Sequence, residues 1–162
     1  MKLIKTLLTI LFISLLSSPS WSMTLDDLVE REGLYYEKFT DVPFSGEVTG
    51  KEQGSFRNGE REGAWISYWD NGQLRSKGNW KNNKREGVWF NYVDNGTLDS
   101  EGNFTNGINE GTWAYYYRNG QLSYKGNWKN GKQDGAWVSY NEDGTVDKEL
   151  TRTYKDGIKI SD

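Results

Sequence analysis

The chain has no cysteine and no histidine in its 162 residues. Without cysteine there are no disulfides and no thiol nucleophile, and without either residue nearly every zinc site is excluded. The missing imidazole also removes the commonest general base at neutral pH. Aliphatic side chains are sparse, whereas Phe, Trp and Tyr make up 15% of the residues. This composition indicates a thin β-structure built on large rings, and it counts against an enzyme.

Long apolar runs are scarce too, and the longest lies near the start, at residues 7–16. Lys2 and Lys5 precede it, and Ser20-Trp21-Ser22 follows it as a small-x-small cleavage pattern. A membrane span needs roughly 20 apolar residues, so the run predicts a signal peptide, residues 1–22, rather than an uncleaved anchor. We expect an exported protein, periplasmic or secreted after cleavage near Ser22. No cysteine sits at the cut, so no lipid anchor is expected.

Basic charge is also in short supply. The net charge is −3, and removal of residues 1–22 takes away Lys2 and Lys5 and no acid, which leaves −5. Nucleic-acid binding calls for a clustered basic face, and anionic membranes attract basic segments. We therefore expect no nucleic-acid partner, and membrane lipid is a disfavoured one.

A fixed period of 24 residues dominates the rest of the chain. Such a period is the signature of a repeat array, and arrays mostly present surfaces to partners. The recurring residues are Gly63, Gly87, Gly111 and Gly135; Trp65, Trp89, Trp113 and Trp137; Tyr68, Tyr92, Tyr116 and Tyr140; Gly72, Gly96, Gly120 and Gly144; and Leu74, Leu98, Leu122 and Val146.

Each unit reads as two strands and two turns. Residues 64–69 are rich in strand-favouring side chains, and residues 73–80 alternate with the strand period of two. Between them, a three-residue loop Asp70-Asn71-Gly72 would set Tyr68 opposite Leu74. The predicted fold is all-β: an elongated, single-layer antiparallel β-meander of 24-residue hairpin repeats, preceded by a short helical lead-in.

Because the period is even, side-chain facing should be preserved from unit to unit. Even positions such as Ile66, Tyr68 and Trp80 are mostly apolar, and odd positions such as Ser67 and Lys77 are mostly polar. We therefore predict one apolar and one wet face. The Trp column at 65, 89, 113 and 137 is the exception, placed on the wet face.

The repeat resembles the MORN type, whose pattern is aromatic-x-Gly-x-aromatic-x-x-Gly-x-x-x-Gly. Residues 124–131 with Gly135 fit it position by position, as do residues 102–107 with Gly111. In the unit before, Asn83 replaces the loop glycine. Trp where the family often has another glycine is similar to a bacterial variant group described as YwqK-family antitoxins. The resemblance covers roughly residues 33–160, and it implies a MORN-like fold and a toxin as partner.

The ends of the array differ from its middle. We predict a lead-in or cap over residues 23–44 and the array over residues 45–162. Residues 23–32 suggest a short helix with Thr24 as N-cap, and Ile158 and Ile160 suggest a last edge strand. Ten strands would span roughly 48 Å, too long for this lead-in to cover alone. Strong curling of the sheet or a homodimer is therefore expected.

Catalytic and metal sites are not expected. The acids that could pair as in glycosidases are Glu60, Glu62, Glu86, Glu110 and Asp134, and all lie in turns or beside the repeat glycine, which indicates solvated turns. Asp70-Asn71-Gly72 and Asp94-Asn95-Gly96 have too few ligands for calcium loops. We predict no catalytic, cofactor-binding or metal-binding residue, and no cofactor.

Aromatic side chains are the functional candidates. The Trp column could simply pack over Arg75 or Lys77, whereas Trp69, Tyr115 and Tyr117 do not repeat, so packing need not explain them. The first hypothesis is a protein-binding module, possibly toxin-neutralising, and the alternative is an envelope carbohydrate or peptidoglycan binder. The tentative partner-binding residues are Trp65, Trp69, Trp89, Trp113, Tyr115, Tyr117 and Trp137.

Overall fold

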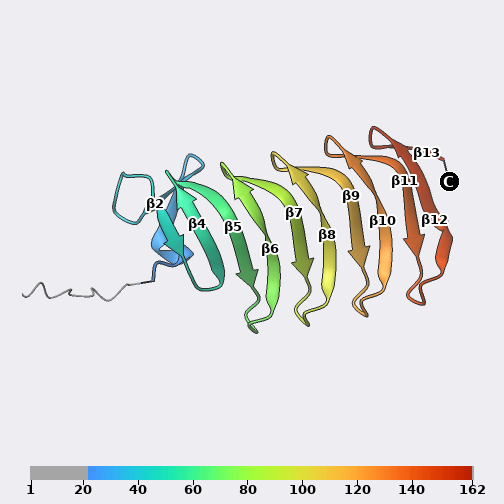
Figure 1. Cartoon of the computed structure of the whole chain (residues 1–162), viewed down its shortest axis with the longest axis horizontal. Helices are drawn as coiled ribbons and strands as arrows, with labels where there is room; N and C mark the ends of the chain where they lie inside the picture. Colours follow the sequence, from blue (N-terminus) through green and yellow to red (C-terminus); the bar gives the residue numbers. More distant parts are fainter. Residues whose placement is uncertain (1–21, 162) are drawn as a thin grey trace, which may run out of the picture.

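The computed structural model describes residues 22–161, so the predicted signal peptide lies outside the described residues except for Ser22. Eleven strands form one antiparallel sheet in chain order, and two further strands pair separately. Figure 1 shows the strands side by side along one long axis. The elements are η1 (Leu25–Asp27), β1 (Leu28–Arg31), β2 (Leu34–Glu37), β3 (Gly46–Val48), β4 (Glu52–Arg57), β5 (Glu60–Tyr68), β6 (Leu74–Lys81), β7 (Lys84–Tyr92), β8 (Leu98–Thr105), β9 (Ile108–Tyr116), β10 (Leu122–Lys129), β11 (Lys132–Tyr140), β12 (Val146–Lys155) and β13 (Ile158–Ser161).

The all-β meander is confirmed, and so is the three-residue hairpin loop. Tyr68 lies opposite Leu74, and the same pairing recurs in the next three units. Gly72 has a φ of 83°, which glycine adopts without steric cost. Within residues 22–161, no helix is long and apolar enough to cross a membrane.

The predicted division into an apolar even face and a wet odd face is wrong. Beyond the Tyr68–Leu74 pair, Ser67 lies opposite Ser76 and Trp65 opposite Gly78, so Arg75 is an extra residue in β6. Such a bulge shifts a strand by one residue, and a shift of one moves every side chain to the other face. Odd positions of β5 therefore share a face with even positions of β6.

This shared face, here the aromatic face, carries both ring columns. The side chains that define it are Phe56, Trp65, Trp80, Trp89, Phe104, Trp113, Trp128 and Trp137. Each column Trp meets the ring nine residues earlier, on the preceding strand, edge to face with centroids 5.1–5.6 Å apart. The opposite face holds Ile66 and Phe90, partly covered by cross-strand neighbours such as Lys77, whose ammonium lies 5.0 Å from the Phe90 ring.

Trp–Gly contacts form the core of each unit. Each Trp of the column lies over the glycine eleven residues earlier, so a Cβ on Gly54, Gly78, Gly102 or Gly126 would sit 2.0–2.4 Å from ring atoms. The indole N–H of Trp89 donates to the Asn79 carbonyl at 3.0 Å, and each other column Trp makes the equivalent bond. A single-layer sheet thereby buries large rings against its own backbone.

The helical lead-in is not supported. Residues 25–27 form a single 3-10 turn, and the next residues form the β1–β2 hairpin. Thr24 precedes the turn, where its backbone N–H and hydroxyl both donate to the Asp27 carboxylate, at 2.9 and 2.7 Å. The chain passes from this turn directly into the β1–β2 hairpin, where Leu28 packs with Val48, Phe56 and Trp65.

Candidate functional site

The four column tryptophans are buried, with 2–4% of their surface exposed. Their predicted position on a wet face is therefore wrong, because the bulge in each hairpin turns them toward Phe56, Trp80, Phe104 and Trp128. Their neighbours are also not the expected ones, since each ring covers a glycine. The column tryptophans thus serve the packing of the sheet, and Trp65 and Trp89 also line a surface hollow.

The three non-repeating aromatics are only half-buried, and the structure ties each to its neighbours. The indole N–H of Trp69 donates to the Tyr92 carbonyl at 3.0 Å, and the hydroxyl of Tyr117 donates to the Tyr140 carbonyl at 2.8 Å. Both bonds link one unit to the next. Tyr115 stacks on Tyr124 with ring centroids 4.3 Å apart and an interplanar angle of 8°. These rings remain candidates for partner contact at their exposed edges.

Three of the five turn acids accept a hydrogen bond from a turn backbone. The carboxylate of Glu62 accepts the backbone N–H of Asn82, and Glu86 and Glu110 accept those of Asn106 and Asn130, at 2.8–3.1 Å. Each asparagine has a φ near +50° at the turn into the next unit. Within residues 22–161, no group of three or more acidic side chains could hold a metal ion. The carboxylates thus fix turns between units.

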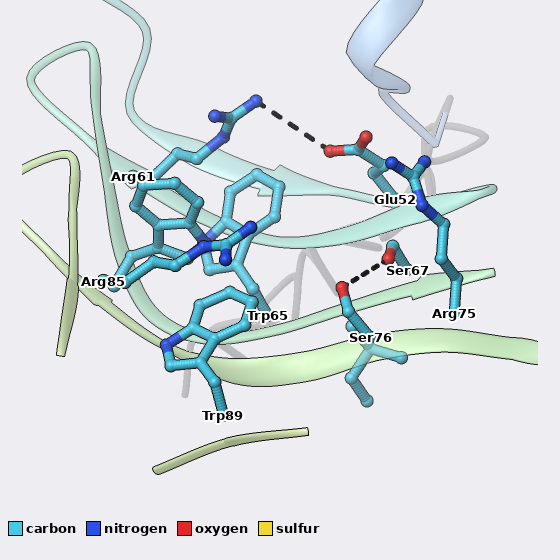
Figure 2. A pocket seen from close by; sticks show the side chains of 10 residues that line it. Glu52, Arg61, Trp65, Ser67, Arg75, Ser76, Arg85 and Trp89 are labelled. Atoms are coloured by element: carbon cyan, nitrogen blue, oxygen red, sulfur yellow. Dashed lines mark hydrogen bonds and ion pairs between the residues drawn. The ribbon is translucent and has the colours of Figure 1, made fainter. Parts of the chain in front are cut away.

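An arginine-lined hollow is the main feature that sequence reasoning missed. Figure 2 shows Arg61 and Arg85 entering it from one side and Arg75 from the other, above Ser67 and Ser76. The hollow measures about 200 Å³. Ser67 and Ser76 are hydrogen-bonded through their hydroxyls at 2.7 Å and form its floor.

The guanidinium groups lie over aromatic rings. Arg61 lies 5.1 Å from both the Trp65 and the Trp80 ring centroid, and Arg85 lies 4.4 Å from that of Trp89. Burial and the positive charges of Arg61 and Arg75 lower the pKa of the Arg85 guanidinium. An arginine stays protonated even so, and the hollow therefore holds a concentrated positive charge on an acidic protein.

The repeat register carries the signal that could have found this site. Arg61 and Arg85 occupy one repeat position, where the later units have Asn109 and Gln133. The floor serines Ser67 and Ser76 correspond to Tyr115 and Tyr124, which fill the same space two units later. Arg75 corresponds to Asp99, Ser123 and Asp147. Residues that differ between units are not needed for the unit to fold, so they are the candidates for function.

Comparisons with known proteins identify the repeat. Three consecutive segments, residues 61–82, 85–106 and 109–130, match the MORN repeat variant, so the chain contains at least this run of such repeats. That match identifies the type of repeat and does not assign the chain to the narrower antitoxin group. No curated protein matches the chain.

One similar solved structure is a crystal structure of a GtfA/B complex bound to UDP and GlcNAc. The alignment has 16% identity and a TM-score of 0.23, and it covers 82% of this chain and 29% of that chain. The present chain thus spans less than a third of the length of that chain.

Proposed function

We propose that this chain of MORN-variant repeats is an exported, non-enzymatic protein that binds a protein partner along its aromatic face. The observation that supports the proposal most is the split within each unit. Residues that hold the sheet together repeat, whereas polar residues that line the surface hollows, such as Ser67, Arg75 and Ser76, are replaced in other units. A variable surface on a constant scaffold is how repeat proteins bind partners.

The composition of the aromatic face suits a protein partner. Trp, Tyr and Arg are the residues most enriched at binding hot spots. Trp69, Arg75 and Arg85 line one hollow together, beside Asn91 and Ser100. Neutralisation of a toxin is what the resemblance to the antitoxin group implies, and it is the narrower form of this proposal.

Binding of envelope glycans is the weaker candidate. Sugar recognition by stacking needs an accessible indole or phenol face. The column tryptophans are buried, and guanidinium groups lie over Trp65, Trp80 and Trp89. Tyr115 and Tyr124, which are half-exposed, stack on each other, so each already uses one ring face.

Site-specific photo-cross-linking in the producing cells tests the proposal. A photoreactive residue in place of Asn109 lies on the aromatic face, opposite Phe104. One in place of Val88 lies on the opposite face and serves as the matched control. We expect one discrete cross-linked protein, identified by mass spectrometry, from position 109 and none from position 88. Equal cross-linking from both faces, or none from either, would refute binding through the aromatic face.

If the partner is a toxin, expression of the partner alone should arrest growth. Co-expression of this chain should then restore growth. A cross-linked partner that is harmless when expressed alone would remove the antitoxin interpretation and leave the binding function in place.

A further inference from the structure

The arginine hollow continues into a second one over the next unit. The two share Arg75, Ser76 and Arg85, and the second measures about 350 Å³ and reaches Asn91 and Ser100. Together they form an open trough across β5 to β8, here the arginine trough. Small side chains keep it open, because Tyr115 and Tyr124 occupy the equivalent space farther along the array.

Two of the three arginines in the trough lack a carboxylate partner. Arg61 lies 3.9 Å from the Glu52 carboxylate, which is a long contact. Among residues 22–161, no acidic side chain lies within 4 Å of the Arg75 or Arg85 guanidinium groups. The other acid lining the trough is Asp99, which accepts a hydrogen bond from the Ser100 hydroxyl at 3.3 Å. Three guanidinium groups thus face two carboxylates.

The guanidinium groups are held in place for binding. Arg85 is stacked over Trp89 and also lies 5.3 Å from the Phe104 ring, and Arg61 lies between Trp65 and Trp80. The Nε of Arg61 is buried and has no hydrogen-bond acceptor among the described residues. A guanidinium with its faces covered still offers its N–H edge, which matches a carboxylate or phosphate in two parallel hydrogen bonds.

The surroundings favour a carboxylate over other anions. The trough is open and elongated, so it suits a chain lying across it better than a small enclosed molecule. Guanidinium groups already lie over the indole rings of the trough, which disfavours stacking of a sugar or a base; these rings are Trp65, Trp69, Trp80 and Trp89. Glu52 and Asp99 reduce the positive potential, which disfavours a doubly charged phosphate more than a singly charged carboxylate.

We propose that the arginine trough binds an acidic peptide segment, with glutamate or aspartate carboxylates bonded to the guanidinium groups of Arg61 and Arg85. The inference rests on the proposed function, because the segment would belong to the protein partner. Arg75 lines both hollows where they meet and adds the third positive charge. Bound carboxylates would offset the mutual repulsion of the three arginines.

The spacing of the two arginines sets the spacing of the acids. Arg61 and Arg85 stand one repeat apart, two strands along the sheet, which is about 9.6 Å at ~4.8 Å per strand. A polyproline II chain has three residues per turn and advances ~3.1 Å per residue, so side chains three positions apart point the same way and are about 9.3 Å apart. We therefore expect a preference for a Glu-x-x-Glu spacing in a segment running along the array.

A titration monitored by NMR tests this with defined probes. The 15N-labelled chain is titrated with a short peptide carrying Glu-Ala-Ala-Glu, with the same peptide carrying Gln-Ala-Ala-Gln, and with inorganic phosphate. We expect the Nε–H resonances of Arg61 and Arg85 to shift with the glutamate peptide, with at least about tenfold tighter binding than with the glutamine peptide, because charge-assisted hydrogen bonds exceed neutral ones by roughly that factor.

Variants copied from the chain's own repeats provide the controls. Arg61→Gln, Arg75→Ser and Arg85→Asn together place at these positions the residues found at 133, 123 and 109. Ser67→Tyr with Ser76→Tyr fills the trough as Tyr115 and Tyr124 do in the third unit. Either set should weaken the glutamate peptide at least about tenfold while the circular dichroism of the sheet stays unchanged.

The outcomes separate this inference from the proposed function. Equal binding of both peptides, tighter binding of phosphate than of the glutamate peptide, or full binding by the filled variant would each overturn the acidic-peptide assignment. If a cross-linked partner is found and its capture is unaffected by the arginine variants, the trough inference fails and the binding function stands. If the glutamate peptide binds but no partner cross-links, the proposed function fails and the assignment of the trough as a site for acidic peptides stands.

Discussion

At the scale of single residues, the fold depends on glycines that lie under tryptophan rings, where there is no room for a side chain. A Cβ on Gly102 would come within 2.0 Å of the Trp113 ring, and Gly102 is buried. Glycine is therefore needed here for close approach rather than for backbone freedom, since the φ of Gly102 is not positive. The glycine of each x-Gly-x pattern and the column Trp eleven residues later therefore form a single contact.

Gly102→Ala should lower the free energy of unfolding by about 1–3 kcal/mol, because the ring cannot move without disturbing its neighbours. Urea unfolding followed by tryptophan fluorescence measures this. Ser123→Ala is the matched control, and a change within about 0.5 kcal/mol is expected. A Gly102→Ala protein as stable as the control would show that the ring has room to shift.

Tyr115 should make the fold sensitive to alkaline pH. Burial raises the pKa of its hydroxyl to about 12, from an ordinary value of 10.0. Above pH 10 the unfolded chain loses this proton while the folded chain keeps it, so stability present below pH 10 falls as pH rises toward 12. Burial also raises the pKa of Tyr116 to about 12, with help from its hydrogen bond to Glu101.

Urea midpoints measured at pH 8 and at intervals up to pH 12 test this sensitivity. They should fall above pH 10, and less steeply in Tyr115→Phe than in the natural chain. An identical slope in the two proteins would contradict the role of Tyr115.

At the scale of elements, hydrogen bonds between turns tie consecutive units together. Gly107 donates its N–H to the Arg85 carbonyl at 2.9 Å, and Gly131 donates to the Asn109 carbonyl at 3.0 Å. Carboxylates complete the same turns, as Glu110 does for Asn130. Asn83, which departs from the family pattern, donates from its side chain to the Gly33 carbonyl at 2.7 Å and so joins the array to the lead-in.

Glu110→Ala should destabilise the protein by roughly 1–2 kcal/mol, because the Asn130 N–H loses a charged acceptor. Glu110→Gln keeps an acceptor oxygen and should cost less. Glu60→Ala is the control, since the Glu60 carboxylate has no ion-pair partner within 4 Å among residues 22–161. Thermal unfolding of the three variants measures the order, and equal losses for Glu110→Ala and Glu60→Ala would refute the turn role.

At the scale of the whole molecule, the N-terminal end of the sheet is covered by a hairpin and the C-terminal end is an exposed edge strand. The N-terminal hairpin packs on the first unit, where Tyr35 lies 4.8 Å from Phe56 between ring centroids. At the other end, β13 is an edge strand, and Ile158 and Ile160 are more than half exposed. A homodimer remains a prediction, and sedimentation velocity over a range of concentrations would measure it.

Removal of residues 23–44 should loosen only the near end of the array, because each unit contacts only its neighbours. Hydrogen exchange should become at least about tenfold faster in β4 and β5 and change less than about twofold in β11. Phe39→Ser is the control within the same segment, since Phe39 is fully exposed. Loss of protection along the whole sheet would show instead that the array unfolds as one unit.

The sequence by itself determined the 24-residue unit, the all-β meander, the three-residue hairpin loop and the last edge strand, because these follow from local turn chemistry and the repeat period. Only the tertiary structure decided which side chains share a face, since one bulged residue at Arg75 reverses the facing of a strand without disturbing the period. It also decided that the tryptophans are core and that three arginines from different strands meet, because contacts across strands depend on register.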